Sequence, residues 1–227
     1  MDRLNVIITG ATGMVGEGVL YECLHHEKVE KVLVINRNPS GYIHPKLTEI
    51  IHPNLFDISM LEDRLSGYNT CYFCLGVTSL GKDETEYTRL TYILTMNFAT
   101  TLATLNQSMT FCYVSGMGTD SSEKGRSMWA RVKGKTENDL VKLPFKVVYN
   151  FRPGGMIPFL PLKPSQTFYK TYKYVGWLFY LIKIITPGYL IGIKDLANAM
   201  INVALNHYPK NVLEVKDIKI LANANTR

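Results

Sequence analysis

A glycine-rich turn, TGATGMVG at residues 9–16, constrains the fold of this chain more than any other feature of its sequence. It follows the short apolar run LNVIIT and opens a stretch in which apolar residues recur with helical spacing. Gly10, Gly13 and Gly16 let the backbone turn tightly, approach a pyrophosphate closely and pack helix against strand. The free amides at the start of the helix favour phosphate. The turn therefore predicts a dinucleotide site, with its other contacts at Thr12, Met14 and Val15.

Strand-like and helical patterns alternate beyond this turn. Apolar, β-branched runs predict strands at residues 4–9, 31–37, 46–52, 69–76, 110–116 and 145–151. Helical patterns cover residues 14–27, 58–66, 84–107 and 127–143, and a further helix is expected at 195–207, followed by a polar tail. Such alternation of apolar strands with helices predicts an α/β fold with a parallel sheet covered on both faces. A chain of 227 residues that is 46% hydrophobic forms one domain, residues 1–227.

Composition narrows the choice of partners and compartment. The net charge is +6, but the lysines and arginines are spread along the chain, so we expect no nucleic-acid partner. The chain starts MDRLNVII without a cleavable signal pattern or a span long enough for a membrane, which favours the cytoplasm. We expect the cysteines, including Cys71 and Cys74, to be reduced thiols that are buried as small side chains. No histidine has a metal-ligand spacing, so we expect no metal.

The end of the second strand bears on the choice of cofactor. A carboxylate there would bind the ribose 2′-hydroxyl of NAD, but the sequence has Asn36 followed by Arg37. An arginine can donate to a 2′-phosphate in a forked, charge-assisted contact. The sequence favours NADP over NAD, the alternative being an exposed loop arginine.

Five segments together resemble the atypical short-chain dehydrogenase/reductase superfamily: GATGMVG, FCLGVT, VSGMG, VKGKTE and FRPGGMI. Their order is most similar to the group of Tat-interacting-protein-like oxidoreductases and NAD(P)-binding epimerase-like proteins. The resemblance implies a Rossmann-type doubly wound sheet, with residues 155–227 contributing a small helical substrate region. It also implies a small-molecule substrate or sensed ligand.

The resemblance assigns a place to several residues by position. Asp57 would lie near the adenine, and Leu75 and Gly76 along the adenosine ribose. Three residues would surround the carboxamide of the nicotinamide: Pro153, Gly154 and Met156. Ser115 and Lys133 match two of the three catalytic positions, and Lys133 would also hold the nicotinamide ribose.

The third catalytic position departs from the family pattern. The family has a tyrosine four residues before the lysine, and this chain has Trp129 there. An indole N–H donates a hydrogen bond but has no titratable proton for the transfer that accompanies hydride movement. Two classes of function therefore stay open: a dinucleotide-binding protein without reductase chemistry, and an NADP-dependent oxidoreductase or epimerase that uses a displaced acid.

Candidates for a displaced acid are Tyr87 and Tyr92 on the long helix and three tyrosines nearer the C-terminus, Tyr169, Tyr172 and Tyr174. Asn97, on the same helix, either supports Lys133 through water or makes a buried helix-capping or interhelical hydrogen bond. Residues 166–185 mix aromatic side chains with lysines. That segment is expected to cover the substrate cleft, with a homodimer contact or a membrane surface as alternatives.

Overall fold

The computed structural model describes residues 3–157 and 189–224. Its main sheet has seven strands, all parallel, in the order β3-β2-β1-β4-β5-β6-β9. The strands span β1 Leu4–Thr9, β2 Val29–Asn36, β3 Leu47–Ile51, β4 Thr70–Phe73, β5 Thr110–Val114, β6 Val147–Arg152 and β9 Val212–Glu214. The strand order reverses between β1 and β4, next to the glycine turn. The predicted Rossmann-type doubly wound sheet is confirmed.

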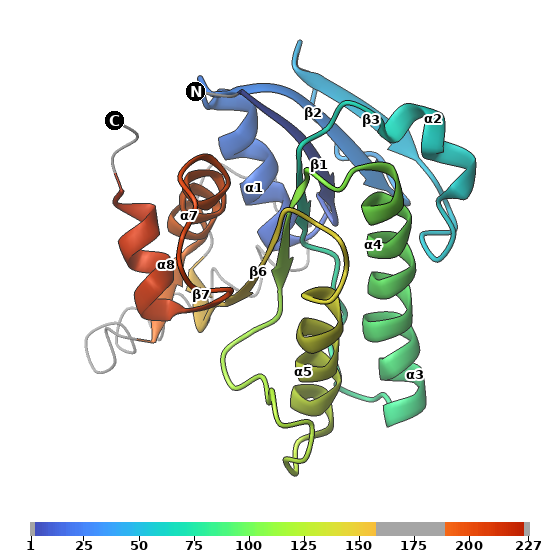
Figure 1. Cartoon of the computed structure of the whole chain (residues 1–227), viewed down its shortest axis with the longest axis vertical. Helices are drawn as coiled ribbons and strands as arrows, with labels where there is room; N and C mark the ends of the chain where they lie inside the picture. The colour runs from blue at the N-terminus through green and yellow to red at the C-terminus, as the bar shows by residue number, and fades with distance from the viewer. Residues whose placement is uncertain (1–2, 158–188, 225–227) are drawn as a thin grey trace.

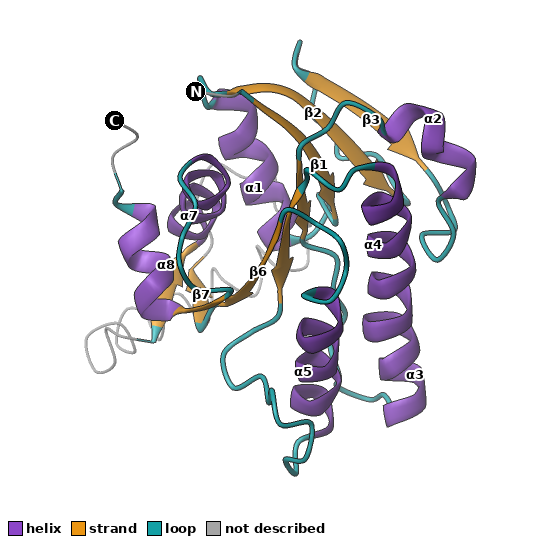
Figure 2. Cartoon of the chain, in the orientation of Figure 1, coloured by secondary structure: helices purple, strands orange, loops and turns teal. Residues whose placement is uncertain are grey.

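Helices cover both faces of this sheet (Figure 1). One face carries α1 (Met14–His25), α7 (Ile193–Leu205) and α8 (Val215–Ala222). The other carries the short turns η1 (Ser59–Leu61) and α2 (Glu62–Leu65), the α3–α4 helix and α5 (Met128–Leu140). The α3–α4 helix runs as α3 (Glu84–Thr88), a π-helical turn η2 (Arg89–Ile93) and α4 (Leu94–Leu105). Figure 2 shows the resulting three layers of helix, sheet and helix.

Alternating side chains of the central strands build two separate hydrophobic cores. In β1, Val6 and Ile8 pack on the side of α1 and α7, whereas Ile7 packs on the side of α4. Tyr72 and Phe73 in β4 divide in the same way. This is the two-residue period of a strand buried on both faces, and it explains why the strands read as continuous apolar runs.

The C-terminal part contains elements that the sequence did not suggest. Two three-residue strands, β7 (Gly155–Ile157) and β8 (Leu190–Gly192), form a small parallel pair of their own. The expectation of a polar tail after residue 207 is wrong, because β9 joins the edge of the main sheet and α8 follows it. A capping box between Glu214 and Asp217 starts α8. Residues 166–185, with their proposed lid, lie outside the described residues.

Neither described range, 3–157 or 189–224, contains a helix long and apolar enough to span a membrane. Those ranges also contain no group of three or more side chains that could hold a metal ion. The four cysteines are free thiols, with Cys71 fully buried and Cys74 partly buried, as the sequence predicted.

Candidate nucleotide-binding pocket

A pocket of about 510 Å³ opens at the carboxyl edge of the sheet, the edge at which parallel α/β sheets bind ligands. Its walls come from the start of α1, the chain after β4, the chain after β5, one side chain of α5, and the β6–β7 and β8 region. Nine residues predicted for the site line it: Gly13, Met14, Val15, Gly76, Ser115, Lys133, Pro153, Gly154 and Met156. Other lining residues were not anticipated: Cys74, Val77, Thr78, Val114, Gly116, Met117 and Tyr189.

The three glycines of the turn have different tasks. Gly10 has a φ of +70°, and a Cβ there would lie 2.9 Å from backbone atoms of Cys74 and Leu75. A Cβ on Gly16 would lie 2.2 Å from the carbonyl oxygen of Gly10. A Cβ on Gly13 would lie no closer than 3.4 Å to its nearest neighbour, so the folded chain itself has room for one. Gly10 and Gly16 are therefore needed for the turn, whereas Gly13 leaves space open on the pocket side.

Gly13 is also the N-cap of α1, and no side chain caps it. The first amides of a helix have no partner within the helix, and here they start at the pocket wall formed by Met14 and Val15. Glycine at this position and the uncapped helix start together form a cradle that fits a pyrophosphate.

The end of β2 is tied to the same turn. The side-chain Oδ1 of buried Asn36 accepts a hydrogen bond from the amide of Ala11 at 3.1 Å. Its Nδ2 donor is buried and has no hydrogen-bond partner within residues 3–157 and 189–224. Arg37 follows at the surface, exposed.

Several residues predicted to contact the cofactor do not line the pocket. Asp57 is exposed, and hydrogen bonding of its carboxylate with the hydroxyl and the amide of Ser59 lowers the pKa of Asp57. Thr12 is also exposed, and the amide of Leu75 donates to the Thr9 hydroxyl at 3.4 Å. None of Thr12, Arg37, Asp57 and Leu75 lines the pocket, and their cofactor contacts stay predictions.

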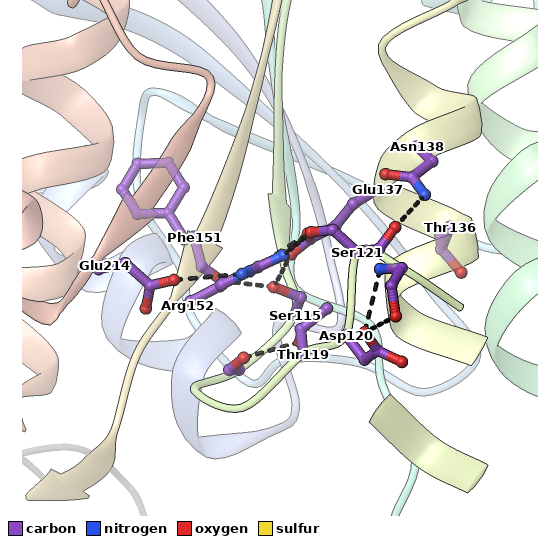
Figure 3. A network of polar contacts seen from close by, with 12 residues as sticks. Ser115, Thr119, Asp120, Ser121, Thr136, Glu137, Asn138, Phe151, Arg152 and Glu214 are labelled. Atoms are coloured by element: carbon purple, nitrogen blue, oxygen red, sulfur yellow. Dashed lines mark hydrogen bonds and ion pairs between the residues drawn. The ribbon is translucent and has the colours of Figure 1, made fainter. Parts of the chain in front are cut away.

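A polar network forms around the buried ion pair of Arg152 and Glu137 (Figure 3). The Arg152 guanidinium contacts both carboxylate oxygens of Glu137, the shortest contact being 2.5 Å, and also reaches Glu214 at 3.2 Å and the Ser121 hydroxyl at 2.6 Å. Burial opposes the charge on Arg152, but the hydrogen bonds and charges of Glu137 and Glu214 outweigh it and raise the Arg152 pKa. The network joins α5, β6, β9 and the loop after β5.

Ser115 belongs to this network. Its Oγ lies 2.5 Å from a carboxylate oxygen of Glu137 and 3.0 Å from the carbonyl oxygen of Phe151 (Figure 3). The hydroxyl proton is thus directed at acceptors of the protein itself. A substrate oxygen would receive it only after the hydroxyl turned away from Glu137, so the catalytic role expected of Ser115 stays a prediction.

Lys133 reaches the pocket from α5 and donates to the carbonyl oxygen of Ser115. Burial lowers the pKa of Lys133 to about 8, and the nearby Glu137 carboxylate only partly offsets this. A lysine with such a pKa changes charge near neutral pH.

The sequence of this chain is similar to those of two known proteins. No protein-family model matches the chain. It is 24% identical over 157 residues to the mitochondrial protein FMP52 of Debaryomyces hansenii, covering 68% of this chain and 67% of the relative. It is 25% identical over 160 residues to the rat protein HTATIP2, covering 69% of this chain and 64% of the relative. The matches thus span about two thirds of the length of each relative.

Solved structures extend the likeness to most of the chain. A UDP-N-acetylglucosamine 4-epimerase from Methanobrevibacter ruminantium M1, in complex with UDP-N-acetylmuramic acid, has a TM-score of 0.69 at 17% identity, covering 94% of this chain and 76% of the epimerase. The Bordetella bronchiseptica enzyme WbmF, in complex with NAD⁺, has a TM-score of 0.69 at 16% identity, and the match covers 97% of this chain and 77% of WbmF. This chain has the fold of the short-chain dehydrogenases and epimerases. The resemblance predicted from its sequence, to atypical members of that superfamily, is confirmed.

Trp129 occupies the position at which the resemblance leads one to expect a tyrosine, one helical turn before Lys133. Its indole packs on the loop after β5, where a Cβ on Gly118 would lie 3.5 Å from Cη2 of the ring. Met117, the residue before Gly118, lines the pocket, but Trp129 does not. The indole therefore packs beside the pocket.

The tyrosines and the asparagine of the long helix also have other partners. Tyr87 is 2% exposed, and neither it nor Tyr92 lines the pocket. The Tyr92 hydroxyl donates to Asp139 at 2.8 Å. Exposed Asn97 donates to the carbonyl oxygen of Phe56 at 3.1 Å, a structural contact with the loop before η1 and not with another helix. Tyr169, Tyr172 and Tyr174 lie outside the described residues.

Proposed function

We propose that this protein binds a nicotinamide dinucleotide, NADP(H) in preference to NAD(H), with the pyrophosphate at the start of α1 and the nicotinamide in the pocket beside Lys133. The observation that carries the proposal is the position of Gly13: its missing side chain leaves open the space in front of uncapped helix amides, at the wall of the pocket. Complexes of fold relatives with NAD⁺ support the class of ligand.

Different residues of this chain would bind the different parts of the dinucleotide. The α1 amides would donate hydrogen bonds to the phosphates, Lys133 would donate to the ribose hydroxyls, and Pro153, Gly154 and Met156 would surround the carboxamide. When bound, the dinucleotide would supply hydride chemistry. Trp129 offers no titratable proton for that chemistry, so α5 supplies no acid and the proposed function is limited to dinucleotide binding.

The preference for NADP rests on the end of β2. Asn36 and Arg37 replace the carboxylate that would accept the ribose hydroxyls, and the buried Nδ2 of Asn36 is a donor without a partner in the described ranges. A 2′-phosphate accepts from both an amide and a guanidinium, whereas a carboxylate at this position would repel it.

A fluorescence titration with NADPH and NADH tests both parts of the proposal. We expect both to bind, NADPH at least tenfold more tightly, and Arg37→Ala to remove most of this difference without weakening NADH binding. Arg64→Ala, a change of another surface arginine, is the matched control. Equal affinity of the wild-type chain for the two dinucleotides would contradict the preference, and binding of neither would contradict the function.

Dinucleotide affinity should fall as the pH rises through about 8. Lys133 carries its charge only below its lowered pKa of about 8, and the charged form is the better donor to the ribose. Titrations between pH 7 and pH 9.5 should show this decline in the wild-type chain. Lys133→Arg keeps its charge throughout and should give a flat profile. A decline of equal size in Lys133→Arg would assign the effect to another group.

The remaining expectations from the sequence belong to the same proposal. Residues 155–227 would form the substrate region, and a homodimer and a cytoplasmic location stay predictions.

A further inference from the structure

One tyrosine that the sequence did not single out lines the pocket. Tyr189 directly precedes β8, and it forms the pocket wall together with Gly154 and Met156. Tyr189 is 45% exposed, so this lining residue is also accessible to solvent.

The glycine pair after β6 makes the space for this tyrosine. A Cβ on Gly154 would lie 2.1 Å from the carbonyl oxygen of Tyr189, and a Cβ on Gly155 would lie 3.1 Å from Cε1 of its ring. The pairing of Gly155 with Leu190 in the β7–β8 ladder fixes the neighbouring backbone. The absence of two side chains thus lets the tyrosine lie directly against β7.

The other proton-bearing groups that line the pocket are less suited to donate a proton to a ligand. Burial raises the pKa of the Cys74 thiol to about 12. The Ser115 hydroxyl is directed at Glu137, and the Lys133 ammonium donates to the Ser115 carbonyl. The Thr78 hydroxyl is an aliphatic alcohol, which does not act as an acid near neutral pH.

We propose that Tyr189 is the catalytic acid of a carbonyl reduction in this pocket, in place of the phenol that α5 lacks. This rests on the proposed function, which supplies NADPH as the reductant. The carbonyl carbon of the substrate gains a hydride from the dihydronicotinamide as the C=O π pair moves to oxygen. That oxygen takes the phenol proton of Tyr189, giving an alcohol, oxidised NADP⁺ and a phenolate, which regains a proton from water at its exposed edge. Apolar lining by Val77, Val114 and Met117 suits a small, uncharged aldehyde or ketone.

Tyr189→Phe in the full-length protein tests this role, with Tyr92→Phe as the matched control because the Tyr92 phenol bonds Asp139 and does not line the pocket. The probe reaction is oxidation of NADPH by 4-nitrobenzaldehyde and a panel of small aldehydes and ketones. We expect Tyr189→Phe to bind NADPH within twofold of wild type and to lose about 10²- to 10⁴-fold in turnover. Tyr92→Phe should keep the wild-type rate.

A second readout does not depend on turnover. 3-Fluorotyrosine placed at position 189 should show a change in ¹⁹F chemical shift when NADPH is added, whereas the same label at Tyr208, which bonds Asp217, should not. Failure of NADPH to bind would overturn the proposed function itself. If NADPH binds, three results would overturn the role of Tyr189 alone. They are an unchanged ¹⁹F signal at position 189, a Tyr189→Phe rate above one tenth of the wild-type rate, and no reduction of any carbonyl compound by the wild-type chain.

Discussion

Replacing Arg152 by methionine should lower the free energy of unfolding by about 3–5 kcal/mol. The substitution leaves the carboxylate of Glu137, whose side chain is only 2% exposed, buried without its cation. It also removes the donors that hold Ser121 and Glu214. Because these partners lie in α5, β9 and the loop after β5, the loss is expected to affect the whole fold. Urea unfolding of the chain without added nucleotide measures it.

Arg131→Met provides the matched control for this prediction. Arg131 also makes a 2.7 Å ion pair, with Glu84, but that pair lies at the surface and should contribute no more than about 1 kcal/mol. The double variant Glu137→Met/Arg152→Met should recover part of the loss, since it buries no unpaired charge. If Arg152→Met were no more destabilising than Arg131→Met, the network would not have the structural role assigned to it.

The two glycines at the start of α1 should respond oppositely to the same substitution. Gly16→Ala places a methyl group 2.2 Å from the carbonyl oxygen of Gly10, an atom of the backbone that cannot move aside cheaply. We expect a loss of about 1–3 kcal/mol or more in the free energy of unfolding. Gly13→Ala meets no atom closer than 3.4 Å, so it should fold almost as well as the wild-type chain.

Nucleotide affinity should separate these variants further. The added methyl group of Gly13→Ala lies on the pocket side of the turn, where the pyrophosphate must approach, so we expect at least a tenfold loss in NADPH affinity. Thermal unfolding and NADPH titration of both variants check the pair of expectations. A folded Gly13→Ala chain with wild-type affinity would show that the dinucleotide does not approach this glycine.

Local patterns were sufficient to predict most of the fold. The apolar run LNVIIT is β1, and the glycine turn opens α1, because both depend on neighbours within a few residues. Strand β9 was not predicted, because its three residues form a strand by pairing with β6, about sixty residues away in sequence. Helix α8 had a local sign, Glu214 three residues before Asp217, in a stretch that otherwise looks like a polar tail.

The sequence predicted site residues that lie near the ends of strands. It did not predict features that depend on partners far away in the sequence. Gly13, Gly76 and Met156 each follow or adjoin a strand end, and all three line the pocket. The hydroxyl of Ser115 was harder to place, because its direction depends on Glu137, which lies 22 residues further along the chain. No local sequence pattern marked Tyr189 as a site residue, since the β7–β8 pairing brings it to the pocket wall.

A crystal structure of the full chain grown with NADP⁺ tests the central claim most directly. We predict density for the pyrophosphate within hydrogen-bond distance of the first α1 amides beside Gly13, the 2′-phosphate near Arg37, and the nicotinamide between Lys133 and Met156. Nucleotide bound away from the glycine turn, or a pocket that stays empty at saturating NADP⁺, would contradict it.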